Sequence, residues 1–507
     1  MFAPLKRLIV GRPIPTFQAH HHKLGLLSGL AILSSDALSS VAYATEEVLR
    51  VLAVGGAEAM QNAPWIAGLI ALLLLIIVSS YRQTIFAYPQ GGGDYIVTKE
   101  NLGPSASLIT AGALLIDYTL TVAVSISAGV SAITSALPGL HVTRVPLALA
   151  FLAVLMIGNL RGLRESVRIF GVPVYLFLAS IFLLLVVGIW RGIFGYTPVA
   201  EAAVPVANFG TGTVTTFVFL TAFANGCTAM TGVEAISDGV PAFREPAART
   251  AARTLTLMGA LAITMFVGIS LLAHHFAIVP STTETVVSQL ARVIFGGRNL
   301  LYYLVQAATA AILILAANTA YSDFPRLAYF VARDRYMPRQ FMNLGDKLAF
   351  SNGIAALSIA AATLITVFGG DPHALIPLYM IGVFISFTLS QTGMLLRWRR
   401  LRPAGWQFRA LISGLGAVVT AVVLAIVAAT KAHEGAWIVL VLLPILVVVF
   451  RQTRLHYDSV GKQLSLEKVE IDTTPHGHMV IVPIGGVHRA VIEALRYASS
   501  LAKDVRA

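Results

Sequence analysis

Cysteine and charge are both scarce in this chain of 507 residues. Cys227 is the single cysteine, so an intrachain disulfide is impossible, and its apolar surroundings indicate a small packing residue. Charged residues make up only 12% of the sequence, whereas 57% are hydrophobic and the mean hydropathy is +0.78. Soluble domains carry about twice that share of charge. The composition therefore excludes a set of soluble domains and indicates a protein that crosses a membrane many times.

Nucleotide-binding motifs are also missing. The glycine-rich run Tyr88-Pro89-Gln90-Gly91-Gly92-Gly93-Asp94-Tyr95 has neither the Lys-Ser/Thr ending of a P-loop nor a strand before it. A turn or a close approach of helices is the better interpretation of its glycines. Without a Walker motif the chain is not predicted to be a transport ATPase. No other enzyme activity and no cofactor are indicated.

Twelve apolar segments are long enough to cross roughly 30 Å of hydrocarbon. They lie at 24–54, 65–86, 105–136, 145–159, 166–190, 213–238, 250–278, 300–320, 353–369, 373–396, 408–430 and 434–450. We therefore predict an all-α polytopic membrane protein with a transport domain at 24–451 and a cytoplasmic N-terminal segment at 1–23. A cleavable signal sequence is not expected, because the basic N-terminal run leads directly into the first span.

Basic residues are distributed unequally between the two sides of these spans. With the N-terminus inside, 22 Lys and Arg residues fall in inside segments and 6 in outside segments, and 8 follow the last span. Cytoplasmic segments carry the excess of such residues. We therefore expect a multi-pass protein of the cell (inner) membrane with both termini in the cytoplasm. This topology also accounts for the net charge of +12, so no nucleic-acid partner is needed.

Polar residues interrupt the first and the sixth span. The two interruptions are Ser34-Ser35-Asp36-Ala37-Leu38-Ser39-Ser40-Val41-Ala42-Tyr43 and the run from Phe223 to Glu234. Broken helices are tolerated at membrane depth only where they line a wet cavity. The interruptions are five spans apart, and because five is odd, two similar halves must have opposite orientations. The pattern predicts an inverted repeat of five plus five helices, with two additional helices.

Among the acidic residues of the spans, only Asp36, Asp117 and Glu234 are expected to lie deep. Glu46 and Glu47 are expected to approach the outer interface. An ionisable residue at membrane depth indicates a functional site, and a carboxylate in a broken helix suits a cation or a proton. Asp36 and Glu234 stand at the two interruptions and are the candidates for proton coupling.

Hydroxyl groups surround these acids in the sequence. Asp117, Thr121 and Ser125 recur every four residues and so lie on one helical face, and Thr231 precedes Glu234 by three residues. Hydroxyls, carbonyls and one or two carboxylates suit a monovalent cation better than calcium. Taken alone, Thr121 or Ser125 could equally bond to its own helix or hold helices together. A monovalent-cation site is predicted at Asp36, Asp117, Thr121, Ser125 and Thr231.

The residues after Arg451 have a different character. A hydrophilic stretch at 452–477 leads to a strand-like run at 479–484, then Gly485-Gly486 and a helical pattern at 488–502. One strand and one helix cannot bury a core by themselves. We expect residues 452–507 to form an incomplete α/β unit in the cytosol, which is the start of a larger domain or completes itself against a partner.

Three runs resemble the KimA-like branch of potassium uptake (KUP) permeases, in the amino acid–polyamine–organocation superfamily. They are LSSDALSSVAYA at 33–44, FANGCTAMTGVEA at 223–235 and IPLYMIGVFISF at 376–387. The resemblance covers all twelve spans and implies a LeuT-like fold, proton-coupled potassium import and a homodimer. It also implies potassium contacts at Asp36, Tyr43, Asp117, Tyr118, Thr121, Ser125, Thr231 and Glu234, with Tyr379 nearby. The cytosolic domain of this branch is longer than 452–507, so dimer stability through this tail and nucleotide-based regulation stay open.

An amino acid permease, also proton-coupled, is the alternative function on this fold. Such carriers bind the substrate carboxylate on free N–H groups at a glycine-bearing break. The break in the first span has no glycine and carries Asp36, which would repel an anion. A channel is less well supported, because no filter-like run of glycines occurs in the spans. The sequence favours a secondary transporter that imports potassium with protons by alternating access.

Overall fold

The computed structural model describes residues 23–162, 167–194, 215–345, 349–431, 435–465, 479–484 and 489–507, with side chains from 171 onward in the second range. The expectations for the N-terminal segment before Lys23, for residues 466–478 and for Gly485-Gly486 lie outside these ranges. The chain divides into two compact units, residues 1–454 and 455–507. The predicted boundary was at 451/452.

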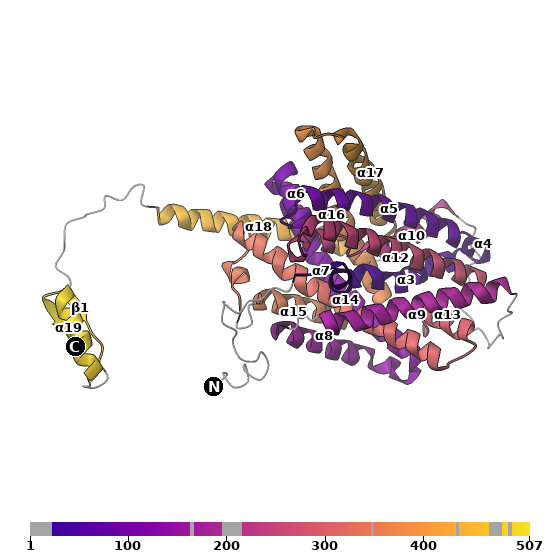
Figure 1. Cartoon of the computed structure of the whole chain (residues 1–507), viewed down its shortest axis with the longest axis horizontal. Coiled ribbons are helices and arrows are strands. Elements are labelled where there is room, and N and C mark those ends of the chain that lie inside the picture. The colour runs from indigo at the N-terminus through magenta and orange to yellow at the C-terminus, as the bar shows by residue number, and fades with distance from the viewer. Residues whose placement is uncertain are drawn as a thin grey trace. The chain divides into compact units, whose positions relative to one another are not determined.

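The first unit is a bundle of helices (Figure 1). Its α-helices are α2 (Leu26–Leu33), α3 (Ser35–Val54), α4 (Ala57–Met60), α5 (Ala63–Ala87), α6 (Gly93–Leu102), α7 (Pro104–Ala136), α8 (Arg144–Leu160), α9 (Val167–Ile193), α10 (Thr216–Gly226), α11 (Ala235–Asp238), α12 (Ala247–His275), α13 (Val286–Phe295), α14 (Leu300–Arg333), α15 (Ser351–Val367), α16 (Pro372–Leu401), α17 (Trp406–Lys431) and α18 (Trp437–Gln463), the last of which continues into the second unit.

Within the described ranges, ten helices are long and apolar enough to cross a membrane, and the bent pair α2/α3 makes an eleventh. A polytopic helical membrane protein is therefore confirmed. Helix α15 is shorter, with 17 residues, and it coincides with the expected ninth span at 353–369. The count of twelve spans stays a prediction.

Both predicted interruptions are present. The chain bends by 52° between α2 and α3, with Ser34 as the only residue between them. In the sixth span, α10 ends at Gly226, a 3-10 turn covers Cys227–Met230, and α11 is a single turn. Ser39 and Ser40 donate hydrogen bonds to the carbonyl oxygen of Asp36 at 3.0 and 2.9 Å. Such side-chain bonds satisfy backbone groups near a break.

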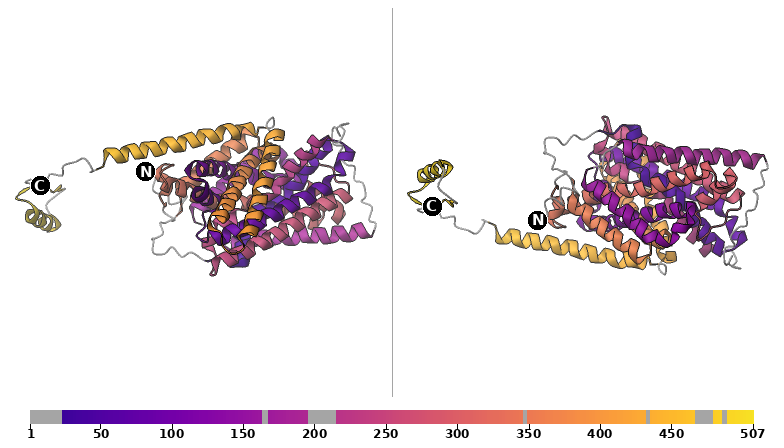
Figure 2. Two further views of the ribbon diagram at one scale, coloured as in Figure 1. Left: turned by 90° about the horizontal axis from the view of Figure 1, so that it is seen from above. Right: turned by 90° about the horizontal axis from the view of Figure 1, so that it is seen from below.

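Helix α7 lies at the centre of the bundle, and other helices cover it. Of the 18 most apolar consecutive positions of α7, 89% are buried inside the structure. The corresponding share is 11% for the stretch Pro138–Leu160, which contains α8. A helix that is apolar on all sides and buried belongs to a core, whereas exposed apolar helices suit contact with lipid. The two views of Figure 2 show the helices of this unit running alongside one another.

The second unit contains one βαβ arrangement. Strand β1 (Met479–Ile481) pairs in parallel with β2 (Asp504–Arg506), and α19 (Arg489–Leu501) connects them. The predicted strand and helix are present, whereas β2 was missed. Its three residues carry one apolar side chain, Val505, between two charged ones, which is too short a pattern to identify a strand.

Candidate functional site

Asp36 lies where the two interruptions meet. It stands in the first turn of α3, its side chain is 5% exposed, and its Oδ1 atom has no hydrogen-bond partner in the described structure. Gly232 follows the 3-10 turn of the sixth span with a φ of +75° and packs against this carboxylate. A Cβ atom at Gly232 would lie 2.6 Å from Asp36 Oδ2. The break of one span therefore abuts the carboxylate of the other.

A chain of hydroxyl groups links α3 to the sixth span and to α16. The hydroxyls of Ser40 and Thr231 are 2.8 Å apart, and Tyr43 donates to Ser40 Oγ at 3.0 Å. The hydroxyls of Tyr43 and Tyr379 are 3.5 Å apart. All four side chains are buried. The structure thus brings together three predicted site residues, Tyr43, Thr231 and Tyr379, and adds Ser40.

The predicted face of Asp117, Thr121 and Ser125 is buried inside the bundle. Thr121 donates to Asp117 Oδ1 at 3.5 Å. Gly382 of α16 approaches from the other side, since a Cβ atom there would lie 3.6 Å from the Cβ atom of Asp117. Asp117 is close enough to Asp36 for their charges to repel each other. Asp117, with Thr121 bonded to it, therefore faces the same region as the break in the first span.

Glu234 joins this acidic group, whereas Tyr118 does not point into it. Glu234 is 3% exposed, its Oε2 atom has no partner in the described structure, and its charge interacts with those of Asp117 and Asp36. Tyr118 is one residue further along α7 than Asp117, so it projects in another direction. Its hydroxyl donates to Asp238 Oδ2 at 3.2 Å. Tyr118 is thus placed to orient Asp238.

Two further buried acids were missed by sequence reasoning. Asp94 accepts hydrogen bonds from Tyr81 at 2.7 Å and from Ser386 at 2.6 Å, and its burial raises the pKa of this carboxyl. Asp323 is 2% exposed in α14, and its carboxylate is 3.9 Å from Arg326. Helix α14 continues to Arg333, beyond the hydrophobic stretch that was expected to end at 320. Buried acids are therefore not confined to the three that were expected to lie deep in the membrane.

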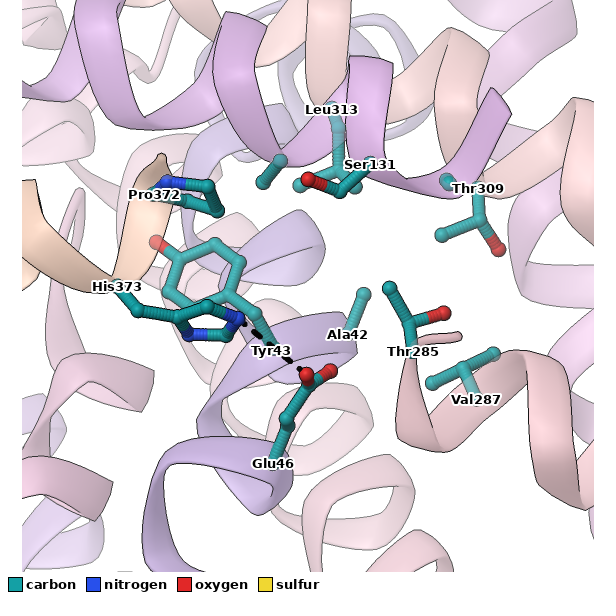
Figure 3. A pocket seen from close by; sticks show the side chains of 12 residues that line it. Ala42, Tyr43, Glu46, Ser131, Thr285, Val287, Thr309, Leu313, Pro372 and His373 are labelled. Atoms are coloured by element: carbon teal, nitrogen blue, oxygen red, sulfur yellow. Dashed lines mark ion pairs between the residues drawn. The ribbon is translucent and has the colours of Figure 1, made fainter. Parts of the chain in front are cut away.

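A pocket opens beside Tyr43 (Figure 3), and Asp36 is not among its lining residues. Its empty volume is about 350 Å³. The lining residues are Ala42, Tyr43, Glu46, Ala128, Ser131, Ala132, Thr285, Val287, Thr309, Leu313, Pro372 and His373. Glu46 and Glu47 are both buried inside the protein, and their approach to the outer interface stays a prediction. Nothing in the sequence indicated a role for His373, because its partners on α3 are more than 300 residues away in the chain.

Comparison with known proteins adds to this geometry. The profile of the amino acid permease family matches residues 24–450. The potassium transporter KimA of Bacillus subtilis (strain 168) is 49% identical over 512 residues, which cover all of this chain and 82% of that protein. The resemblance drawn from the three sequence runs is confirmed, and with it a membrane transporter rather than an enzyme.

Proposed function

The chain belongs to the amino acid permease family, and we propose that within this family it imports potassium ions by alternating access, in symport with protons. The similarity to a potassium transporter over its whole length supports this substrate. We further propose that it does so in the cell membrane, with both termini in the cytoplasm and as a homodimer joined through residues 452–507.

The observation that carries the proposal is a buried acidic site without a positive partner. Asp36, Asp117 and Glu234 lie close enough to repel one another. Within the described ranges, no Lys, Arg or His lies at ion-pair distance from any of the three. Burying a charge without a partner is costly. Such a group of carboxylates is stable only when cations or protons neutralise it, which is the property that a symporter of cations requires.

The surrounding oxygen atoms favour potassium as the cation. Hydroxyl groups supply neutral ligands beside the carboxylates, and a large monovalent ion is held by many oxygens rather than by a dense acidic cage. The proposed ligands are Asp36, Asp117, Thr121, Ser125 and Thr231. Tyr43 and Tyr379 adjoin this set through Ser40 and Thr231, and their paired hydroxyls are proposed to cover the ion. Asp36 and Glu234 are the proposed carriers of the coupled proton.

The inverted repeat is supported by the way helices pack in pairs. Helices of the first half contact their counterparts five spans later: α3 packs on α10, α5 on α12, α7 on α14 and α8 on α15. Helices that are related by a two-fold axis in the membrane plane meet in this manner. Alternating access is the transport mode that such a repeat provides.

An amino acid substrate is the second candidate, and the family to which the chain belongs supports it. The N-terminal end of α3 carries a positive partial charge that could bind a carboxylate group. However, Asp36 already occupies the first turn of α3 and compensates that charge. A zwitterion would therefore meet a negative side chain where its own carboxylate should bind.

Uptake of labelled rubidium, a potassium analogue, by the purified protein in liposomes tests the proposal. Each positive charge that enters gains about 2.3 kcal/mol per 100 mV of inside-negative potential, which allows about fifty-fold accumulation. We expect potassium to compete with rubidium and an inward pH gradient to increase accumulation. Labelled amino acid uptake that potassium does not inhibit, without rubidium uptake, would give precedence to the permease alternative.

A further inference from the structure

A second cluster of buried ionisable groups lies beyond Tyr43, next to the pocket. Glu46 and Glu47 of α3 are 2% and 3% exposed. The imidazole of His373, at the start of α16, lies between them: its Nδ1 atom bonds to Glu47 Oε1, and its Nε2 atom is 3.4 Å from Glu46 Oε1. Figure 3 shows the ion pair between His373 and Glu46 at the edge of the pocket.

Each carboxylate of this cluster also has a partner on another element. Glu46 Oε2 accepts a hydrogen bond from the backbone N–H of Val286, the first residue of α13, at 3.2 Å. Glu47 Oε2 accepts from the side-chain amide of Asn225, near the end of α10, at 3.3 Å. The cluster therefore joins α3, α10, α13 and α16. Two of these, α3 and α10, directly flank the interruptions of the first and sixth spans.

The cluster and the cation site are connected through Tyr43. The pocket is lined by Tyr43, Glu46 and His373 together. The hydroxyl of Tyr43 continues through Ser40 to Thr231 in the cation site. The cluster thus lies on the same route as the cation site, at the end that the predicted topology places outside the cell.

The negative charges of this cluster outnumber its positive charges. With a protonated imidazole the three groups carry one net negative charge, whereas a neutral imidazole leaves two buried carboxylates without a positive partner. Tyr43 is the other titratable residue of the lining. In the turn before α16, Asp371 Oδ1 accepts a hydrogen bond from the backbone N–H of His373 at 3.0 Å, and Arg144 lies beside Gly369. Among the described residues, the side chains that α7, α10, α14, α13 and the residue before α13 contribute around the cluster are uncharged: Ser131, Asn225, Thr285, Val287, Thr309 and Leu313.

We infer that Glu46, Glu47 and His373 form a proton-binding site separate from the cation site, and that a proton bound there holds the pocket end of the transport route closed. The bound proton draws α16 onto α3 through two ion pairs. Its release leaves two carboxylates that repel each other, so the start of α16 can separate from α3. This inference rests on the proposed function, because it assigns one step of the transport cycle.

The experiment uses the full chain and two variants, His373→Gln and Glu47→Gln. Glutamine at 47 can still accept the hydrogen bond from Asn225, so the variant removes mainly the charge. His274→Gln is the control, because His274 is exposed at the end of α12. Rubidium uptake into liposomes is measured at a fixed membrane potential and fixed internal pH, while the external pH is varied.

We expect the parent and the control to share a pH profile. The parent should show a pH dependence between about pH 6 and about pH 9, and His373→Gln should lose it, because a glutamine side chain does not titrate. Glu47→Gln should shift the midpoint of the profile toward lower pH by about one unit, because one of the two carboxylates that stabilise the proton is gone.

Thermal unfolding of the same proteins in detergent gives a readout that does not depend on transport. The midpoint temperature of the parent should fall as the pH rises through this range, and this fall should be absent in His373→Gln. If the parent did not take up rubidium, but its midpoint temperature fell with pH and that of His373→Gln did not, the proton site would be supported and the proposed function refuted. Unfolding profiles of His373→Gln or Glu47→Gln that follow the parent at every pH would overturn the inference.

Discussion

Replacing Gly232 by alanine should weaken cation binding, although glycine supplies no side-chain ligand. Gly232 has a φ of +75°, and an added Cβ atom would lie 2.6 Å from Asp36 Oδ2 and 3.0 Å from the backbone nitrogen of Ala37. Ordinary contact begins at about 3.4 Å. The carboxylate of Asp36 must therefore move by about 0.8 Å, since the backbone of α3 is held by its own hydrogen bonds.

Two separate costs follow from this substitution. An alanine in the left-handed region costs about 1–2 kcal/mol of stability. The displaced carboxylate weakens its attraction for the ion. At an effective dielectric near 20, an increase of the ion–oxygen separation from about 2.8 Å to about 3.6 Å costs about 1.3 kcal/mol. That corresponds to a rise of about ten-fold in the rubidium concentration for half-maximal uptake.

Gly405→Ala is the matched control for the backbone cost. Gly405 has a φ of +72°, and an added Cβ atom would meet nothing within 4 Å. Both variants should lose similar stability in thermal unfolding, whereas only Gly232→Ala should change the concentration dependence of rubidium uptake in liposomes. If Gly232→Ala, reconstituted in equal amount, gave the same half-maximal concentration as Gly405→Ala, the contact between Gly232 and Asp36 would have no part in placing the carboxylate at the ion.

Three other changes test separate parts of the structure. In a potassium-uptake-deficient bacterial strain, Asp117→Asn should abolish growth at low potassium, whereas Ser125→Ala should only raise the potassium requirement. The reason is that a lost charge costs several kcal/mol and a lost neutral ligand about one. If Asp117→Asn were expressed and restored growth normally, Asp117 would not be a ligand of the cation. Deletion of 452–507 should leave rubidium uptake intact and weaken dimerisation, so a truncated protein that stays dimeric in dilute detergent would refute the proposed contact. Because burial raises the pKa of Asp94, ionisation of this carboxyl opposes folding. As the pH rises above the ordinary range of a carboxyl, the parent should therefore lose thermal stability relative to Asp94→Asn, and parallel unfolding profiles would contradict this.

Hydropathy and the positions of the polar interruptions were sufficient to predict most of the fold. An apolar run of spanning length has few alternatives to a helix, and a charged residue grouped with several hydroxyls inside such a run indicates a break that lines a cavity. The end of α14 was not predictable in this way. Asp323 and Arg326 ended the apolar pattern at 320, but the helix continues because it remains packed inside the protein, where the two side chains form an ion pair.

The candidate site was predicted where neighbours in the sequence are also neighbours in space. Asp117, Thr121 and Ser125 follow from helical periodicity alone. The contact of Gly232 with Asp36 and the bond between Ser40 and Thr231 join residues about 190 positions apart. The two interruptions predicted that these segments meet, but neither spacing nor the resemblance indicated Gly232 or Ser40. No resemblance or spacing indicated His373, because its meaning depends on Glu46 and Glu47, which were placed at an interface.

Helix α3 connects the proposed cation site at Asp36 with the cluster of Glu46, Glu47 and His373, and this connection bears on coupling. Asp36 stands in its first turn and Glu46 ten residues later, so about 15 Å of one continuous helix separates them. The 52° bend at Ser34 separates α3 from α2, so the two segments are not one continuous helix. A tilt that opens the contact between Glu46 and His373 must also shift Asp36 against Gly232. A cation held at Asp36 and a proton held at His373 would then bias the same rigid element, and by linkage each would change the affinity for the other by the same factor.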